Sequence, residues 1–295
     1  MTPISLAEPV SDLCCELGEG PVWVAATGRL SWVDVLAGRL HSAAWTDGAL
    51  TDLRTLQHDA PVGAAAPRRG GGWVLAAGTG FVLVSPGDRV TGLIEAEPGR
   101  AGSLRMNDGK CDPAGRFFAG SMAYDGAEGA GSFFRLAPNG EVTRVLEETS
   151  ISNGLAWSAD GRTLYWIDTP TGRLTAFDYD PETGDLGESR VFLQAAPGES
   201  PDGMTVDAED GVWIAYWGSG AVRRFDRAGE PTDVVELPVT QPTCPTLGGN
   251  DLRTLFVTTA YHGLGDEGRE RQPLAGRVFA CEVDVPGQPT AAFAG

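Results

Sequence analysis

The sequence repeats one short pattern six times, at intervals of roughly 40–50 residues. Most copies begin with a polar residue and a glycine, pass through a glycine-containing turn, and continue into a segment rich in β-branched and aromatic residues. The turn positions of the six copies are Gly28, Gly72, Gly115, Gly161, Gly211 and Leu252. A repeat of this length made of short strands is typical of a β-propeller, in which each copy forms one blade.

Glycine and proline are abundant, with 41 and 20 residues among 295. Inside a helix each glycine costs about 1 kcal/mol and each proline about 3 kcal/mol, so a protein of long helices is excluded. We therefore expect an all-β fold, a six-bladed β-propeller of four-stranded antiparallel blades, in one domain over residues 1–295. An N-terminal strand should complete the last blade, because ring closure removes free sheet edges. Helix is expected only as one turn at residues 267–272.

The chain is acidic, with 40 Asp and Glu residues against 22 Lys and Arg and a formal net charge of −18. This argues against a nucleic-acid partner and against a polybasic membrane contact, since both need clustered positive charge. No apolar run approaches about 18 residues, and the N-terminus lacks the basic and apolar regions of a signal peptide. The five cysteines are odd in number and fit no zinc-binding spacing, which indicates reduced thiols and a cytoplasmic protein.

Equivalent positions of the repeat carry different polar residues. The residue before the first glycine is Glu19, Asp108, Asn153 or Asp202 in four of the six copies. Because the first strand of every blade lines the central channel, Glu19, Asn153 and Asp202 should face one another, with Asn107 and Asp108 nearby. Asp and Asn before glycine are also common turn residues, and this alternative stays open. It is weaker for Glu19, because glutamate is a poor turn former.

Carboxylate and amide oxygens that meet in a narrow channel repel each other unless a positive charge lies between them. Such a donor set suits Ca²⁺, Mg²⁺ or Mn²⁺. Zn²⁺ is less favoured, because it prefers His or Cys and no histidine lies at these positions. The repeat therefore predicts a divalent-cation site on the axis.

Several longer segments resemble the regucalcin (senescence marker protein) and gluconolactonase family, and they follow the family's order from near one end of the chain to the other. They are GEGPVW at 18–23, RMNDGKCDPAGRFFAGSM at 105–122, ISNGLAWS at 151–158, FDYDPETG at 177–184, SPDGMTVDAEDGVWIAYW at 200–217 and RQPLAGRVF at 271–279. The resemblance implies a six-bladed propeller with one divalent metal on its axis. The family includes lactonases that act on the lactones of sugar acids.

Carried over position by position, the resemblance places the metal on Glu19, Asn153 and Asp202, the three residues that the repeat also selects. It gives Asp202 a second role as proton acceptor and donor. Calcium is the cation that we expect, while Mn²⁺, Mg²⁺ and Zn²⁺ stay open.

The resemblance also implies three substrate contacts. Two of them fall on Arg105 and Asn107. The third is a glutamate in the family, and the matching residue here is the shorter Asp125. Glu128 of the same glycine-rich loop is the alternative to Asp125.

The function that follows is a metal-dependent hydrolase that opens small sugar lactones, such as glucono-, xylono- or arabinonolactone, to sugar acids. The metal would act as a Lewis acid and Asp202 as the general base. One alternative is a calcium-binding protein without lactonase turnover. Another is a hydrolase of lipophilic lactones or organophosphates, against which Arg105 and Asn107 argue because they suit hydroxylated substrates. A small sugar lactone is the expected partner, and a monomer is favoured.

Other reactive side chains have simpler interpretations. Cys111 is expected to be a small buried apolar residue. His41 and His58 are expected in loops or outer strands, and His262 follows the last predicted blade strand, near the rim of the pocket.

Overall fold

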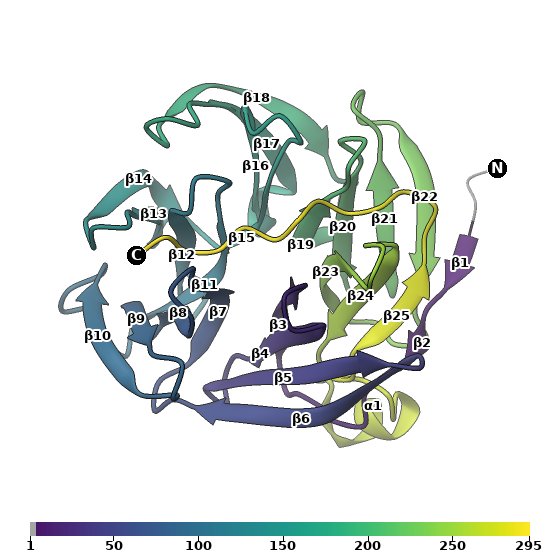
Figure 1. Ribbon diagram of the computed structural model, residues 1–295. Coiled ribbons are helices and arrows are strands. Elements are labelled where there is room, and N and C mark those ends of the chain that lie inside the picture. Colours follow the sequence, from purple (N-terminus) through teal and green to yellow (C-terminus); the bar gives the residue numbers. More distant parts are fainter. Residues whose placement is uncertain (1–3) are drawn as a thin grey trace.

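Six β-sheets surround a central axis in the computed structural model, which describes residues 4–295 (Figure 1). This arrangement confirms the predicted six-bladed propeller. Within each sheet, consecutive strands pair antiparallel, from an innermost strand at the axis to an outermost strand at the rim. From the axis outward, the first three blades contain β3 (Gly18–Val24), β4 (Arg29–Asp34), β5 (Arg39–Thr46) and β6 (Ala49–Gln57); β7 (Val62–Pro67), β8 (Trp73–Ala77), β9 (Gly80–Val84) and β10 (Val90–Glu95); and β11 (Leu104–Cys111), β12 (Phe117–Ala123), β13 (Gly131–Leu136) and β14 (Val142–Thr149).

The other three blades continue in the same order. They contain β15 (Ser152–Trp157), β16 (Thr163–Asp168), β17 (Arg173–Tyr179) and β18 (Leu186–Gln194); β19 (Ser200–Val206), β20 (Val212–Trp217), β21 (Ala221–Phe225) and β22 (Pro231–Glu236); and β23 (Pro242–Gly248), β24 (Thr254–Thr259) and β25 (Phe279–Glu282). A 3-10 turn, η1 (Thr169–Thr171), follows β16, and a helix, α1 (Gly265–Arg271), follows β24. The helix lies where one turn was expected, although it begins two residues earlier and ends one residue earlier.

The burial of the strands explains their composition. The innermost strands β15 and β23 are buried along their whole length and are rich in small residues, which let neighbouring blades approach closely at the axis. The second strands carry large aromatic side chains such as Trp32, Phe117 and Tyr216, which fill the wider space between blades. The outermost strands β6 and β18 are largely exposed. The burial of the side chains therefore decreases from the inner strands to the rim.

The N-terminal segment closes the ring, as predicted. Strand β2 (Glu8–Pro9) pairs antiparallel with β25 and supplies the fourth strand of the last blade. Strand β1 (Ile4–Leu6) was not expected: it pairs parallel with β22 and adds a fifth strand beside the four antiparallel strands of that blade. The extra strand covers an edge that would otherwise offer unpaired backbone groups.

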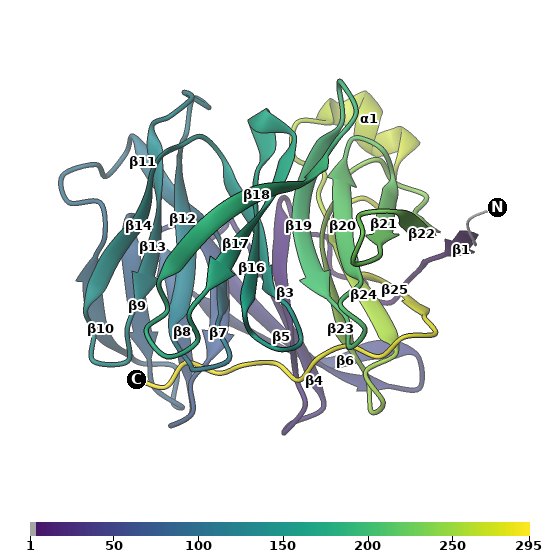
Figure 2. The same cartoon turned by 90° about the horizontal axis from the view of Figure 1, so that it is seen from above.

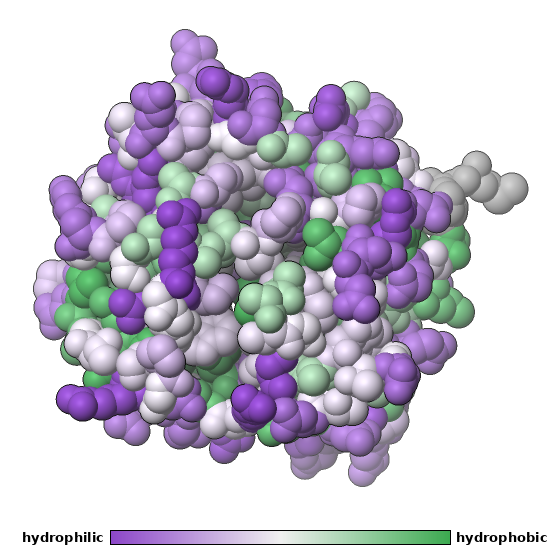
Figure 3. Space-filling view, in the orientation of Figure 1, coloured by the Kyte–Doolittle hydropathy of each residue, from purple (hydrophilic) through white to green (hydrophobic). Residues whose placement is uncertain are grey.

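The C-terminal segment, residues 283–295, crosses one face of the ring, and α1 lies on the opposite face (Figure 2). Phe293 exchanges backbone hydrogen bonds with Pro67 and Arg69 of the second blade, and the Ala294 amide donates to the Gly115 carbonyl of the third. The Phe293 ring is 1% exposed and belongs to the core between these blades. Figure 3 shows this face, with hydrophilic residues prominent around its rim and less polar residues nearer its centre. The segment thus ties the second and third blades together at this face.

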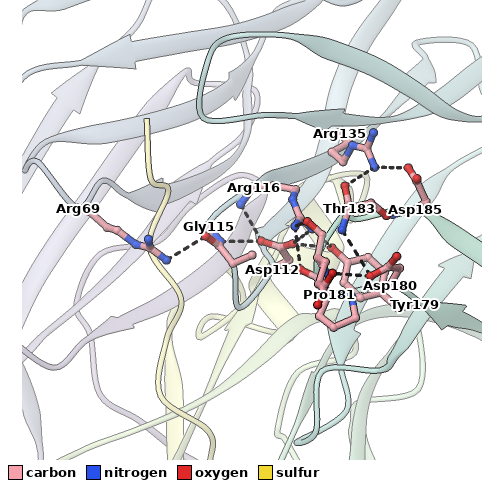
Figure 4. A network of polar contacts seen from close by, with 12 residues as sticks. Arg69, Asp112, Gly115, Arg116, Arg135, Tyr179, Asp180, Pro181, Thr183 and Asp185 are labelled. Carbon is pink, nitrogen blue, oxygen red and sulfur yellow. Dashed lines mark hydrogen bonds and ion pairs between the residues drawn. The ribbon is translucent and has the colours of Figure 1, made fainter.

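A buried polar network joins the third and fourth blades (Figure 4). Asp112 is fully buried and accepts hydrogen bonds from the Arg116 side chain at 2.8 Å and from the Tyr179 hydroxyl. Arg116 also donates to the carbonyl oxygens of Pro181 and Glu182, at 2.8 and 2.7 Å. Because every charged group has a partner, the network can be buried without a large desolvation cost. Within residues 4–295, no helix is long and apolar enough to span a lipid bilayer.

Candidate metal centre

Every innermost strand has a break in its register with the second strand of its blade. The breaks lie between Glu19 and Val22, Val62 and Ala64, Met106 and Gly109, Ser152 and Leu155, Pro201 and Met204, and Pro242 and Cys244. A β-bulge interrupts pairing and redirects a side chain, which is why bulges often adjoin active sites. A bulge therefore recurs in all six innermost strands, and in several of them it contains a polar residue.

The bulges correct one part of the repeat comparison. The first residue inside the bulge is Asn107 in β11, Asn153 in β15 and Asp202 in β19. Asn107, and not Asp108, thus occupies the position of Asn153 and Asp202. An alignment on the first glycine was off by one in the third copy, because Gly109 there follows the bulge instead of lying in it.

Three buried carboxylates meet at this end of the channel. Burial, together with the charges of Asp202 and Asp108, raises the pKa of Glu19 well above its ordinary value, and Arg105 partly opposes the shift. Burial and the charge of Asp108 likewise raise the pKa of Asp202. Burial also raises the pKa of Asp108, against the opposing charge of Lys110. Carboxylates with such pKa values are held in a site that favours added positive charge.

The oxygens of the predicted metal ligands are poorly satisfied within residues 4–295. Asp202 Oδ1 is buried and has no hydrogen-bond partner there. Glu19 Oε2 accepts a hydrogen bond from the Gly20 amide at 3.1 Å. Asn153 donates its Nδ2 to Thr169 Oγ1 at 3.0 Å, and its Oδ1 accepts a long contact of 3.5 Å from Asn107 Nδ2. Two carboxylates and one amide oxygen form a donor set that fits a hard divalent cation.

The three carboxylates do not form one compact cluster. In the described part of the chain, Glu19, Asp108 and Asp202 do not form a set whose oxygens all lie within 4.8 Å of one another. Asp108 Oδ1 accepts the Gly109 amide at 2.7 Å, and Lys110 donates to the Met204 carbonyl at 2.8 Å. Asp108 therefore contributes negative charge to the site but does not complete the ligand set.

Two of the predicted substrate contacts lie together beside this donor set. Arg105 is buried and donates from Nη1 to Asn107 Oδ1 at 2.7 Å and to the Met106 carbonyl at 3.1 Å. Asn107 donates from Nδ2 to the Ser152 carbonyl at 2.9 Å, and the same nitrogen lies 3.5 Å from Asn153 Oδ1. A chain of contacts thus runs from Arg105 to the amide of the predicted ligand Asn153.

Asp125 and Glu128 are not part of this chain of contacts. Both lie on the exposed loop after β12, and Asp125 Oδ1 accepts the amide of Ala127 at 3.1 Å. Tyr124, which precedes Asp125, interacts electrostatically with Arg105 and is 48% exposed. Sequence reasoning missed Tyr124, although its place directly after a β-strand beside the predicted contact was a signal. The substrate contact of Asp125 stays a prediction.

Cys244 is a second residue that the sequence did not indicate. It is 2% exposed, lies against Gly203, and its pKa is raised by burial and by the charges of Asp108 and Glu19. Like the second copy, the sixth has an apolar residue before its first glycine, so nothing pointed to this position. His262 is exposed and lies 3.2 Å from Glu16, so it belongs to the surface of the last blade. Cys111 is buried among apolar residues, as predicted.

A separate cavity of about 280 Å³ lies at the opposite ends of the innermost strands. It is lined by the ends of these strands, including Lys110 and Thr205, and by the C-terminal segment at Gln288 and Ala291. None of the predicted ligands or substrate contacts lines it. The two ends of the channel therefore differ, one bearing the polar cluster and the other a mostly apolar hollow.

Comparisons with known proteins agree with this architecture. The SMP-30/gluconolactonase/LRE-like region, a protein family, matches residues 17–261. Regucalcin of Gallus gallus is 38% identical over 288 residues, which cover 95% of each protein. A Bacillus subtilis (strain 168) protein named "Putative sugar lactone lactonase YvrE" is 32% identical over 287 residues, which cover 97% of each protein. A solved structure of the calcium-binding protein regucalcin from Agrobacterium tumefaciens str. C58 superposes with a TM-score of 0.93, at 30% identity over 99% of each chain.

Proposed function

Because this chain belongs to the SMP-30/gluconolactonase/LRE-like family, we propose that it is a divalent-metal-dependent hydrolase that opens small sugar lactones to sugar acids. The observation that carries the proposal is the juxtaposition of two sets of side chains. Glu19, Asn153 and Asp202 present oxygen donors, and the paired Arg105 and Asn107 lie beside them. One set suits a cation and the other suits the hydroxyl groups of a sugar.

A divalent cation held by Glu19, Asn153 and Asp202 would supply Lewis-acid polarisation of a lactone carbonyl. Calcium is the cation that the name of the Agrobacterium relative supports. The unpartnered Oδ1 of Asp202 and the cluster of carboxylates around it are what make this assignment physically reasonable.

Asp202 is the residue that moves protons in the proposed reaction. Its carboxylate accepts a proton from the water that attacks the carbonyl carbon, and a bond forms between the water oxygen and that carbon. When the tetrahedral intermediate collapses, the bond between the carbonyl carbon and the ring oxygen breaks. The proton then passes from Asp202 to the departing ring oxygen, which becomes a hydroxyl group, and the carboxylate is regenerated.

Arg105 and Asn107 orient the substrate. Arg105 has further N–H groups beside the one that it donates to Asn107, and these would bind hydroxyl oxygens of the sugar ring. Holding the ring in one orientation places the carbonyl carbon near the attacking water, which lowers the entropic part of the barrier. Exclusion of bulk water around the buried Arg105 strengthens these contacts.

The test is lactone hydrolysis by protein stripped with a chelator and then supplied with Ca²⁺, Mn²⁺, Mg²⁺ or Zn²⁺. A panel of sugar lactones with five- and six-carbon chains would be followed by acid release. We expect turnover that depends on the metal and that falls by about 10²–10⁴-fold in Asp202→Asn. Asp47→Asn, in an exposed turn with a positive φ that asparagine tolerates, is the matched control and should keep full activity.

Two other outcomes would overturn the proposal. Tight calcium binding without turnover on any lactone would favour the calcium-binding alternative. Turnover confined to lipophilic lactones or organophosphates would favour a different hydrolase and would remove the role of Arg105 and Asn107 in binding hydroxyl groups.

A further inference from the structure

A second group of metal-ligand side chains lies in the first blade, apart from the residues of the channel site. The Cys15 sulfur, a carboxylate oxygen of Asp34 and a ring nitrogen of His41 all lie within 4.8 Å of one another. The three residues are 1%, 5% and 2% exposed. Among residues 4–295 this is the one such group of His, Cys, Asp or Glu side chains. A sulfur, an oxygen and an imidazole nitrogen form a different donor set from the oxygens on the axis.

The fold brings these residues together through the pairing of β4, β5 and β6. His41 on β5 pairs with Trp32 on β4 and with Thr55 on β6, so the three side chains share one face of the blade. Asp34 lies two residues after Trp32 on the same strand and therefore points to the same face. Cys15 reaches this face from the loop that precedes β3, where its amide donates to the Gly276 carbonyl at 2.8 Å.

His41 has one satisfied nitrogen and one unsatisfied nitrogen. Nδ1 lies 2.8 Å from the Thr55 hydroxyl, whereas Nε2 is buried and has no partner within the described residues. A buried polar atom without a partner costs stability, so this nitrogen points to a missing ligand. Burial lowers the pKa of His41 to about 4, so the ring is neutral near pH 7 and keeps a lone pair for a metal.

The other two donors are oriented by neighbouring groups. The Trp32 indole nitrogen donates to the Cys15 sulfur at 3.4 Å. The backbone amides of Glu16 and Leu17 donate to the two oxygens of Asp34, at 3.2 and 3.1 Å. Thr55 contacts His41 in the same way, so each of the three donor side chains has a polar partner that fixes its orientation. Outer partners of this kind hold metal ligands in place in known sites.

We propose that Cys15, Asp34 and His41 bind a zinc ion. A thiolate and an imidazole are the donors that Zn²⁺ prefers and that Ca²⁺ avoids. One thiolate and one carboxylate also balance the two positive charges of the ion, and His41 Nε2 gains its missing partner. These residues provide three of the four donors of tetrahedral zinc.

The ion would enter while the protein folds. The three side chains are closed off from solvent, and the loop that carries Cys15 is held by a backbone hydrogen bond to Gly276. Without metal, burial raises the pKa of the Cys15 thiol to about 12, so the thiol keeps its proton. Zinc binding displaces that proton to solvent, as is usual for cysteine ligands.

The first test is substitution with Co²⁺, whose bond to a thiolate gives a charge-transfer absorption in the near ultraviolet. Protein refolded with Co²⁺ should show this absorption, and Cys15→Ser and His41→Gln should lose or weaken it. Cys14→Ser is the matched control, because Cys14 is the adjacent residue and its side chain is exposed. Asp202→Asn should also keep the band, which separates this site from the channel site. A band that persists in Cys15→Ser, or none in the wild type, overturns the proposal.

The second test needs no variant. X-ray absorption at the zinc edge of the intact protein should show one sulfur neighbour at about 2.3 Å together with nitrogen and oxygen neighbours at about 2.0–2.2 Å. A spectrum with nitrogen and oxygen neighbours alone, or a protein that retains no zinc after refolding with it, contradicts the assignment. Lactone turnover enters neither test, so the result is independent of the proposed function.

Discussion

Arg105 and Asn107 are joined to each other by a hydrogen bond of 2.7 Å between Nη1 and Oδ1. Asn107 in turn donates a hydrogen bond to the Ser152 carbonyl of the fourth blade. The two side chains therefore hold each other's orientation across a bulge of β11. A change in either one alters the position of the other.

We expect this coupling to appear in a double-mutant cycle. Arg105→Ala and Asn107→Ala should each lower kcat/KM for a sugar lactone, and the double variant should lose less than the sum of the two effects. The interaction energy should fall in the range of about 0.5–3 kcal/mol that is typical of residues in contact. Steady-state kinetics on the four proteins measures it. Strict additivity would show that the two side chains act independently.

Asp125 should matter less than Asn107. Its carboxylate is exposed and already accepts the amide of Ala127, so it can offer the substrate only part of its hydrogen-bonding capacity. We expect Asp125→Asn to raise KM by about tenfold or less, with kcat nearly unchanged. Glu128→Gln, on the same loop, is the comparison. A large loss of kcat in Asp125→Asn would mean that the loop closes over the reacting atoms.

The stability of metal-stripped protein should fall as the pH rises above about 4, the ordinary pKa of a carboxyl group. Burial raises the pKa of Glu19 and Asp202 well above this value, so the folded protein still holds protons that the unfolded chain has released. When the folded state binds more protons than the unfolded state, the free energy of unfolding decreases with pH.

Thermal unfolding in the presence of a chelator measures this slope. Asp202→Asn removes one of the two titrations, so its Tm should depend less on pH than that of the wild type. Asp47→Asn should follow the wild type. Equal slopes for all three proteins would mean that these carboxylates do not have raised pKa values.

The buried network between the third and fourth blades should be a large source of stability. Asp112→Asn leaves the Arg116 charge buried without its partner and should lower the free energy of unfolding by about 3–5 kcal/mol. Tyr179→Phe removes one hydrogen bond to a charged group and should cost about 1.5–3 kcal/mol. The exposed pair of Asp185 with Arg135 provides a control, since Asp185→Asn should cost about 1 kcal/mol or less. Urea unfolding measures the change in the free energy of unfolding for each of the three variants. Losses of similar size in all three would contradict a special contribution of the network to stability.

The overall fold was predictable because it is encoded six times. Each copy of the repeat contains its own turn and strands, so an irregular copy such as the one at Leu252 does not hide the period. The closing N-terminal strand was predictable for the same reason, because the last blade keeps a free sheet edge until another strand completes it. The parallel strand β1 was not, because nothing in Ile4–Leu6 distinguishes one sheet edge from another.

The bulge of the third innermost strand was predicted only to within one residue. The repeat located the strand starts, but the length of the bulge in β11 depends on backbone pairing, and this decided between Asn107 and Asp108.

The group in the first blade was invisible in the sequence. Cys15, Asp34 and His41 come from a loop and two different strands, and their spacing matches no zinc motif. Only the register of β4 against β5 brings them to one face. The histidine was expected in a loop or an outer strand, and its burial on the third strand of the blade is what makes it chemically interesting.

The pairing of β2 with β25 has a consequence for the order of events during synthesis. The ribosome makes Glu8 and Pro9 well before their partners Phe279 and Ala280, so β2 stays unpaired while the intervening blades are synthesised at about 5–20 residues per second. The hydrogen bond that Thr243 Oγ1 donates to the Gly18 carbonyl oxygen, at 2.6 Å, also forms late. A chain that stops before β25 therefore has no closed ring to bring Glu19 and Asp202 to one axis.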